Sequence, residues 1–359
     1  MTPEQQRHAE QLAFVASGAE LEIGTPADCP LPLDRLISVR GDEPWVRERF
    51  DGGLTAQVYR VHADGRDWTL KRARARCKVQ KLDGQTSFLN EIQRRADLRA
   101  LKRDPSLAER LESIVDTRYA SYRHGVLLSP WIDGTPIQAW SERQLLQLFD
   151  TLVALLLGGL FEWDLCPGNT LDDGQVRLFD FGYMYRFDPL CAFNSNGTAT
   201  PQFHAAERFE TRQYFAHLLV LETQGEAAAL AAFELEKRIA IEAYRQLRAA
   251  LAKRGASGEV LHWLDSIGQQ WTQGLKAGGE ALYLKEAWRS HWLDLQDDLH
   301  GQTCTASTLA RIDWLQATVE HRYRDLQAVA AVVPADLLLA RLRKARRLAV
   351  RWQLASPRA

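Results

Sequence analysis

The stretch Leu160-Phe-Glu-Trp-Asp-Leu-Cys-Pro-Gly-Asn169 and the stretch Val176-Arg-Leu-Phe-Asp-Phe-Gly182 that follows it determine the fold class we predict. In the first, an Asp is followed five residues later by an Asn. In the second, a short apolar strand ends at an Asp, after a polar turn over 170–174. An apolar run with helical spacing precedes both stretches and stops at Gly158-Gly159. We therefore expect a helix, a loop, a hairpin and a strand end in this order.

This order of motifs resembles the catalytic loop and the Asp-Phe-Gly motif of the protein-kinase-like superfamily. The resemblance implies an α+β, two-lobed protein-kinase-like fold with a helical C-terminal extension, and phosphoryl transfer from ATP. It implies that Asp164 accepts or orients the proton of the attacking hydroxyl, and that Asn169 and Asp180 hold Mg²⁺. Oxygen ligands suit Mg²⁺, which usually takes only one or two carboxylates. An isolated Asp-Phe-Gly would more simply be a turn, so the inference depends on the context.

Alternating residues before this region predict three strands, over 45–50, 57–62 and 67–71. The loop between the first two contains Gly52 and Gly53, which would let backbone N–H groups approach a phosphate. The family has three spaced glycines here, and this chain keeps one of those positions, so a plain hairpin is the alternative.

Lys71 ends the third strand and resembles the family lysine that holds the α- and β-phosphates. A solvent-exposed lysine in a basic segment is the alternative. A helix predicted over 86–101 carries Glu91, which the resemblance assigns as the partner of Lys71 in preference to Asp97.

Two further strands are predicted over 114–121 and 125–132, and the second ends in Asp133-Gly134. This ending looks like the hinge of aminoglycoside and choline kinases, where main-chain groups hold the adenine. Pro130 keeps a carbonyl and Ile132 an N–H, so both suit adenine binding. An ordinary strand-to-helix connection is the alternative.

Three positions of the loop depart from the protein-kinase pattern. Glu162 replaces the usual His, Trp163 the usual Arg, and Cys166 the Lys of Ser/Thr protein kinases. Control by activation-loop phosphorylation is therefore not expected. A small-molecule or glycan hydroxyl is favoured slightly over protein Ser/Thr as the acceptor. The alternative is a catalytically weak pseudokinase scaffold that binds nucleotide and a protein partner.

The chain after about residue 210 predicts helices, over 233–255, 259–273, 280–300, 307–332 and 335–354. Just before them, Glu207 faintly resembles the glutamate that ends an activation segment and pairs with a distant Arg. The last helix and the residues after it carry seven cations and no acidic side chain from residue 341 onward. Either acids such as Asp294, Asp297 and Asp298 lie alongside it, or it contacts an anionic partner or a membrane surface.

The bulk composition is that of a globular protein. A formal net charge of -1 argues against coating nucleic acid with the whole surface, and five scattered cysteines suit a reducing cytoplasm. We expect neither a signal peptide nor a transmembrane segment. The 359 residues divide into an N-terminal extension, a kinase-like N-lobe, a kinase-like C-lobe core and a helical C-terminal region, over 1–40, 41–132, 133–225 and 226–359.

Overall fold

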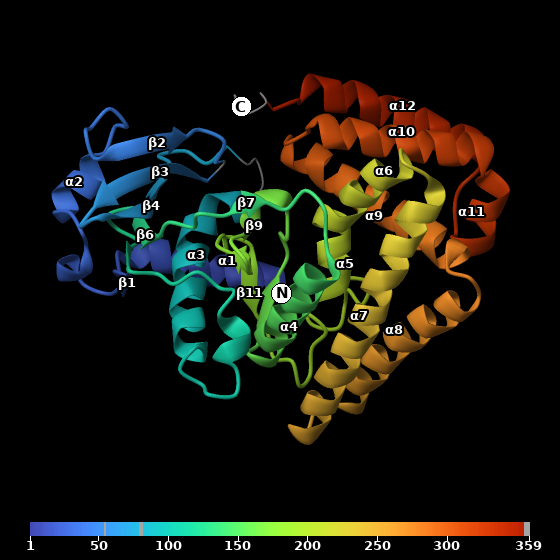
Figure 1. The fold of residues 1–359 in the computed structure, drawn as a ribbon, viewed down its shortest axis with the longest axis horizontal. Coiled ribbons are helices and arrows are strands. Elements are labelled where there is room, and N and C mark those ends of the chain that lie inside the picture. Colours follow the sequence, from blue (N-terminus) through green and yellow to red (C-terminus); the bar gives the residue numbers. More distant parts are fainter. Residues whose placement is uncertain (54, 79–81, 355–359) are drawn as a thin grey trace.

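The computed structural model describes residues 1–53, 55–78 and 82–354 of a mixed α and β chain. A six-stranded antiparallel sheet occupies one end of the molecule, and helices α7 to α12 occupy the other (Figure 1). The strand order is β1-β5-β6-β4-β3-β2. The six strands are β1 (Glu22–Ile23), β2 (Val46–Phe50), β3 (Ala56–Ala63), β4 (Arg66–Ala73), β5 (Tyr119–Ser121) and β6 (Val126–Pro130).

The central hairpin of this sheet forms where the alternating pattern predicts it. Asp64 and Gly65 both have positive φ, 51° and 73°, as a two-residue turn between twisted strands requires. Residues of β3 and β4 pair in register from Ala56–Ala73 to Ala63–Arg66. The strand predicted over 114–121 is shorter than expected. Only β5 joins the sheet, because Ile114 instead forms an isolated parallel bridge with Leu178.

The two faces of the sheet have different cover. The short helix α2 (Leu33–Ser38) packs Leu36 against Tyr59, Val61 and Leu70. On the opposite face, α3 (Leu82–Leu101) packs Phe88 and Ile92 against apolar side chains of β3, β5 and β6. Because side chains alternate along β4, Lys71 points away from the face that holds Leu70.

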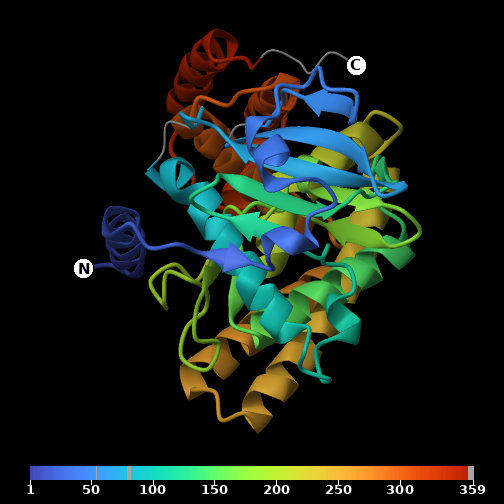
Figure 2. The same cartoon turned by 90° about the vertical axis from the view of Figure 1, so that its left-hand side faces the viewer.

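The N-terminal helix α1 (Pro3–Ser17) begins at a capping box formed by Thr2 and Gln5, and it contacts α3 (Figure 2). The side chain of Gln11 links the two helices. It accepts a hydrogen bond from Thr86 at 2.7 Å and donates one to Asn90 at 3.3 Å. The N-terminal extension therefore packs its first helix on the helix that carries Glu91.

The middle of the chain is built around α4 (Glu142–Leu157), whose long apolar run is almost fully buried. The short strands around it are β7 (Thr135–Pro136), β8 (Leu160–Glu162), β9 (Thr170–Asp172), β10 (Val176–Leu178) and β11 (Met184–Arg186). Strand β9 pairs with both β10 and β7, and β8 pairs with β11. The β8–β11 pairing brings the loop after residue 162 beside the residues after Asp180.

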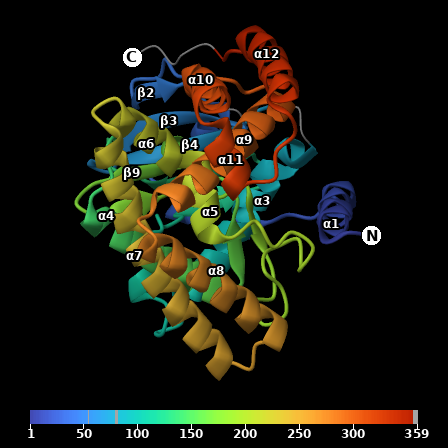
Figure 3. The ribbon, with the colours of Figure 1, turned by 90° about the vertical axis from the view of Figure 1, so that its right-hand side faces the viewer.

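One continuous helix over 205–222 leads into the helical end of the chain. It comprises α5 (Ala205–Phe209), a π turn (Glu210–Tyr214) and α6 (Phe215–Glu222). The remaining helices, seen from that end in Figure 3, are α7 (Glu226–Lys253), α8 (Gly258–Lys276), α9 (Glu280–Gly301), α10 (Ala306–His321), α11 (Tyr323–Val329) and α12 (Ala335–Arg351). The single helix predicted over 307–332 is wrong, because Arg322 leaves the helical conformation and separates α10 from α11.

The basic helix α12 buries Leu338 and Leu342 in a cluster formed with α9 and α10. One of its cations, Arg346, pairs with Asp313 of α10. The acids proposed to lie alongside it, Asp294, Asp297 and Asp298, are directed instead at Arg212. An anionic partner for α12 stays a prediction. Within the described residues, no helix is long and apolar enough to cross a membrane.

Candidate active site

Lys71 lies at the centre of the candidate site. Its ammonium Nζ is 2.8 Å from Glu91 Oε1 on α3 and 2.7 Å from Asp180 Oδ2 after β10. Lys71 and Glu91 are buried, whereas the Asp180 side chain is 32 % exposed. Asp97, the alternative partner, pairs with Arg94 and Arg186 instead. The fold thus brings together three residues that the family resemblance singled out, two of them 109 positions apart in sequence.

Arg95 places a second cation on Glu91. Its Nε and Nη2 donate to Glu91 Oε1 at 3.0 and 2.9 Å, and it also donates to Thr117 Oγ1 and to the carbonyl of Phe179. Arg95 therefore joins α3 to the residue before Asp180. The sequence analysis missed this residue, although its i, i+4 spacing from Glu91 is a recognisable signal.

The electrostatics of Asp180 follow from Lys71. Burial acts to raise the pKa of the Asp180 carboxyl. The charge and hydrogen bond of Lys71, and the N–H of Gly182 at 3.2 Å, outweigh burial and lower this pKa below its ordinary value. Asp180 is therefore ionised at neutral pH and able to bind a cation.

Asp164 and Asn169 are held together within one loop. The amide Nδ2 of Asn169 donates to the backbone carbonyl of Asp164 at 2.8 Å and lies 3.5 Å from its carboxylate. Since the nitrogen faces Asp164, the Oδ1 of Asn169 points elsewhere, and no group of the described residues donates to it. The carboxylates of Asp164 and Asp180 both act to raise the pKa of Tyr183, so the two lie in one electrostatic environment.

Glu162 and Trp163 take structural roles at the positions where the family has His and Arg. Burial raises the pKa of Glu162 well above its ordinary value, and its Oε1 accepts the Asp164 N–H at 2.7 Å. Trp163 donates from Nε1 to Ser195 Oγ at 2.9 Å, which attaches the loop after Asp180. Glu207, for which a distant Arg was expected, pairs with its neighbour Arg208 at 3.0 Å.

Arg212, in the π turn, connects Asp164 to the C-terminal helices. Its Nε lies 2.9 Å from Asp164 Oδ1, and its Nη1 donates to Asp294 of α9. Arg311 of α10 holds the other oxygen of Asp294 at 2.9 Å. Burial acts to lower the pKa of Arg212, but Asp294 and Asp164 raise it well above its ordinary value. No local pattern indicated this contact, because it joins residues of three separated segments.

Asn90 is a further residue that the sequence analysis missed. Its Nδ2 donates to three carbonyls after Asp180, those of Phe181, Gly182 and Met184, at 3.4, 3.0 and 2.7 Å. Since Asn90 also accepts from Gln11 of α1, the N-terminal helix is linked to the loop that follows Asp180.

The glycine loop is only partly described, because Leu54 lies outside the described residues. Arg74 donates to the carbonyls of Gly53 and Asp51 at 2.9 and 3.2 Å. Gly52 is exposed, and a side chain at Gly53 would collide with the Ala56 carbonyl. These contacts tie two carbonyls of the loop between β2 and β3 to Arg74, which follows β4.

Pro130 and Ile132, which were predicted to bind adenine, lie at and just after the end of β6. Pro130 pairs with Trp68, and the next N–H, that of Trp131, bonds to the Asp67 carbonyl. No group of the described residues accepts a hydrogen bond from the N–H of Ile132. This N–H is therefore available to a ligand.

The residues fit a magnesium ion that shares its coordination with a nucleotide. Within the described residues, no three His, Cys, Asp or Glu side chains form a self-contained metal site. Asp180 supplies one ionised carboxylate, and Asn169 an amide oxygen that no described residue engages. Mg²⁺ commonly takes one or two carboxylates and completes its shell with phosphates and water, so a sparse oxygen set is the appropriate kind.

Comparison with known proteins gives limited further information. The sequence matches no protein-family model and no curated protein. A solved structure that it resembles is that of vaccinia related kinase 3, with 15 % sequence identity and a TM-score of 0.30. The match covers 49 % of this chain and 62 % of that chain, so it spans less than two thirds of the neighbour.

Proposed function

We propose that this chain is an ATP- and Mg²⁺-dependent phosphotransferase with a two-lobed kinase-like arrangement. The observation that carries the proposal is the position of Lys71 Nζ between Glu91 and Asp180 at 2.8 and 2.7 Å. One lobe would hold the sheet and α3, over 41–132, and the other the α4 core, over 133–225. The extension over 1–40 and the helices over 226–359 would be additions to this unit.

Each residue has a defined part in the proposed reaction. Lys71, positioned by Glu91, would orient the nucleotide phosphates, and the Ile132 N–H and Pro130 carbonyl would hold the adenine. Asp180 and Asn169 would hold Mg²⁺, which when bound neutralises charge that develops on the phosphates. Asp164 would accept or orient the proton of the attacking hydroxyl.

A small-molecule or glycan hydroxyl remains the favoured acceptor, as in the aminoglycoside- and choline-kinase-type enzymes that the loop resembles. The identity of two loop residues supports this preference. Trp163 and Cys166 carry no positive charge, so the loop offers no cation at either position to bind a phosphorylated activation segment or a protein substrate.

A pseudokinase that binds nucleotide is the second candidate. The ion pair of Arg212 with Asp164 favours it, because a carboxylate held by a guanidinium at 2.9 Å is less free to turn toward a substrate hydroxyl.

Nucleotide-induced thermal shifts, with and without Mg²⁺, followed by measurement of ATP turnover, test the proposal. We expect a Mg²⁺-dependent shift and turnover in the wild type. Asp180→Ala should lose both, because it removes the ionised ligand. Asp336→Ala, an exposed acid on α12, is the matched control and should behave as wild type.

Three outcomes separate the possibilities. A Mg²⁺-dependent shift without turnover over a screen of hydroxyl acceptors would identify the pseudokinase. Turnover unchanged in Asp180→Ala would contradict the metal site. No shift with any nucleotide would reject both candidates.

A further inference from the structure

A basic cavity of about 550 Å³ lies at the C-terminal half of α3. The start of β4, the end of β6 and the segment 114–118 complete its walls. Trp68, Leu98 and Ile114, all buried, form an apolar floor. The cationic side chains that line it are Arg66, Arg95, Arg99, Lys102, Arg103 and Arg118, and the acidic ones are Asp28 and Asp116.

The cavity is separate from Lys71 and from the proposed metal-binding residues, although Pro130, whose carbonyl is proposed to hold the adenine, also lines it. Trp68 packs in the cluster under α2, and alternation along β4 puts Lys71 on the opposite face. Asp164, Asn169 and Asp180 do not line it. Its charge is therefore not explained by the proposed nucleotide site.

Internal ion pairs neutralise only part of this charge. Lys102 pairs with Asp116 at 2.6 Å, and Arg118 with Asp28 at 3.3 Å. Arg95 is satisfied by Glu91. Arg66 lies over the Trp68 ring, at 4.0 Å from its centroid.

Three arginines remain without a direct ion pair, although the charge of Arg99 still acts on Asp28. Among the described residues, no carboxylate lies within ion-pair distance of Arg66, Arg99 or Arg103. Three neighbouring guanidinium groups repel one another unless an anion lies between them. The guanidinium fork matches phosphate oxygens bidentately.

We propose that this cavity binds a small polyanion, a molecule with two or more phosphate groups, held by Arg66, Arg99 and Arg103 above the Trp68 floor. The protein is nearly neutral overall, with a formal net charge of -1. The positive charge of this cavity is therefore a local feature and not part of a general excess of cations.

The cavity is linked to the candidate active site through Arg95. This residue lines the cavity and also bonds to Glu91 and to the Phe179 carbonyl. A polyanion that fixes the C-terminal half of α3 stabilises the position in which Glu91 meets Lys71. It therefore strengthens nucleotide binding, and by reciprocity nucleotide strengthens polyanion binding. This coupling rests on the proposed function, whereas the polyanion site itself does not.

The test of the site is titration calorimetry with inorganic pyrophosphate, without divalent cations. The variant is the double change Arg99→Glu and Arg103→Glu at two exposed positions. The matched control is Lys253→Glu with Lys276→Glu, two exposed cations at the C-terminal ends of α7 and α8. Thermal unfolding of both variants checks that the fold is kept.

We expect the cavity variant to bind pyrophosphate at least about tenfold more weakly, and the control to bind as wild type. Arg99→Lys with Arg103→Lys keeps the charge and should retain most of the affinity. Equal loss in both Glu variants, or no binding by the wild type, would overturn the site. Binding abolished by Lys71→Met alone would assign the anion to the nucleotide site and also overturn it.

The coupling is measured separately, as the Kd of ATP with and without saturating pyrophosphate. We expect ATP binding to tighten about fivefold in the wild type and to stay unchanged in the cavity variant. Competition between the two ligands would contradict the coupling. If ATP does not bind at all while pyrophosphate still does, the proposed function fails and the polyanion site stands.

Discussion

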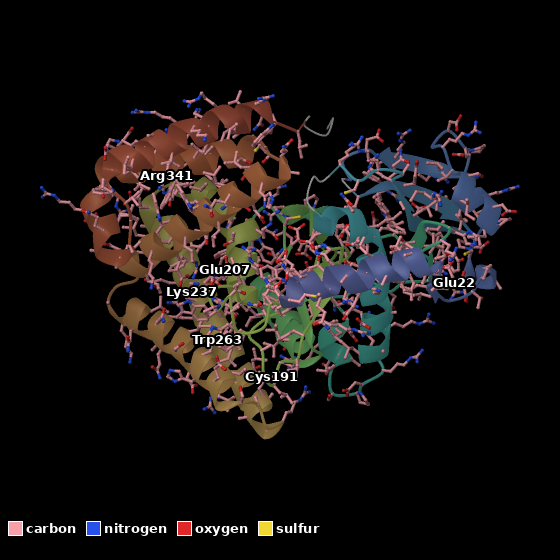
Figure 4. The ribbon with its side chains drawn as sticks, turned by 180° about the vertical axis from the view of Figure 1, so that it is seen from behind. Glu22, Cys191, Glu207, Lys237, Trp263 and Arg341 are labelled. Atoms are coloured by element: carbon pink, nitrogen blue, oxygen red, sulfur yellow. The ribbon has the colours of Figure 1, made fainter. Side chains whose placement is uncertain are left out.

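Two lysines of this chain are buried among carboxylates, and they differ in what can reach them. Lys71 lies between Glu91 and Asp180, and the Asp180 side chain is 32 % exposed. Lys237 of α7 is fully buried among Glu210, Glu236 and Glu286. It also lies 4.6 Å from the centroid of the Trp271 ring, deep in the helical region that Figure 4 shows around it.

The difference shows that a buried ion cluster is not by itself a site. Both clusters offset the cost of burying an ammonium with opposite charge. Only at Lys71 does a partner carboxylate remain accessible to a solute. We therefore expect the two lysines to separate into a residue required for activity and a residue required for stability.

Lys71→Met should give the largest effect. Removing the ammonium leaves the nucleotide phosphates without their positioned cation, so turnover should fall by about 10³-fold, or about 4 kcal/mol of transition-state stabilisation. The melting temperature should change little, because Asp180 can be solvated. Steady-state kinetics and thermal unfolding of the same preparation measure the two. If Lys71→Met instead lowers stability while the folded molecules keep their activity, Lys71 has the same structural role that we expect of Lys237.

Lys237→Met should give the reverse pattern. It removes the cation that Glu210, Glu236 and Glu286 share, so that only Arg289 at 3.3 Å from Glu210 remains, and this should cost about 3 kcal/mol of unfolding free energy. Denaturant unfolding measures this loss. Activity per folded molecule should be kept, and Lys253→Met, at the end of the same helix, is the exposed control. A stable but inactive Lys237 variant would break the comparison.

Arg212→Gln should have an intermediate effect, because Arg212 connects the candidate active site to the C-terminal helices. It removes the guanidinium that links Asp164 to Asp294. The carboxylate of Asp164, the proposed base, can then change its orientation. We expect kcat to fall about tenfold, with the KM for nucleotide nearly unchanged. Arg212→Lys should recover part of kcat. Arg289→Gln, which removes a different cation that contacts Glu210, is the control for general loosening of the helices. Activity that rises in Arg212→Gln would identify the ion pair as inhibitory and refute a positioning role.

The last expected effect is on stability alone and concerns pH and Asp298 of α9. Burial, then the charge of Asp294, raises the pKa of Asp298 to about 7, whereas an unfolded Asp titrates near 4. The folded state therefore binds more protons between these values, and the stability contribution of Asp298 falls as pH rises from about 4 to 7.

Urea unfolding of the wild type and Asp298→Asn at pH 5 and pH 8 tests this sign. The stability of the wild type relative to the variant should fall by about 2 kcal/mol between the two values. A relative stability that is independent of pH would show that Asp298 is ionised at both.

Much of the fold could be predicted because its signals are local. The hairpin at 63–66, the helix that carries Glu91 and the end of α4 at Gly158 follow from turn residues and apolar period. The prediction failed where a helix or strand boundary depends on a contact with a distant part of the chain. Ile114 pairs with Leu178 rather than joining the sheet, and Arg322 interrupts a helix that the apolar pattern continued.

The sequence by itself determined which chemical groups are present and in what order: Lys71, Glu91, Asp164, Asn169 and Asp180. Motif spacing carries this information because each motif is a single loop or strand end. Only the tertiary structure decided that Arg95 shares Glu91, that Arg212 binds Asp164, and that three arginines face an unassigned cavity. These contacts join distant segments, and their energies depend on burial and on charges brought together by packing, which no local pattern contains.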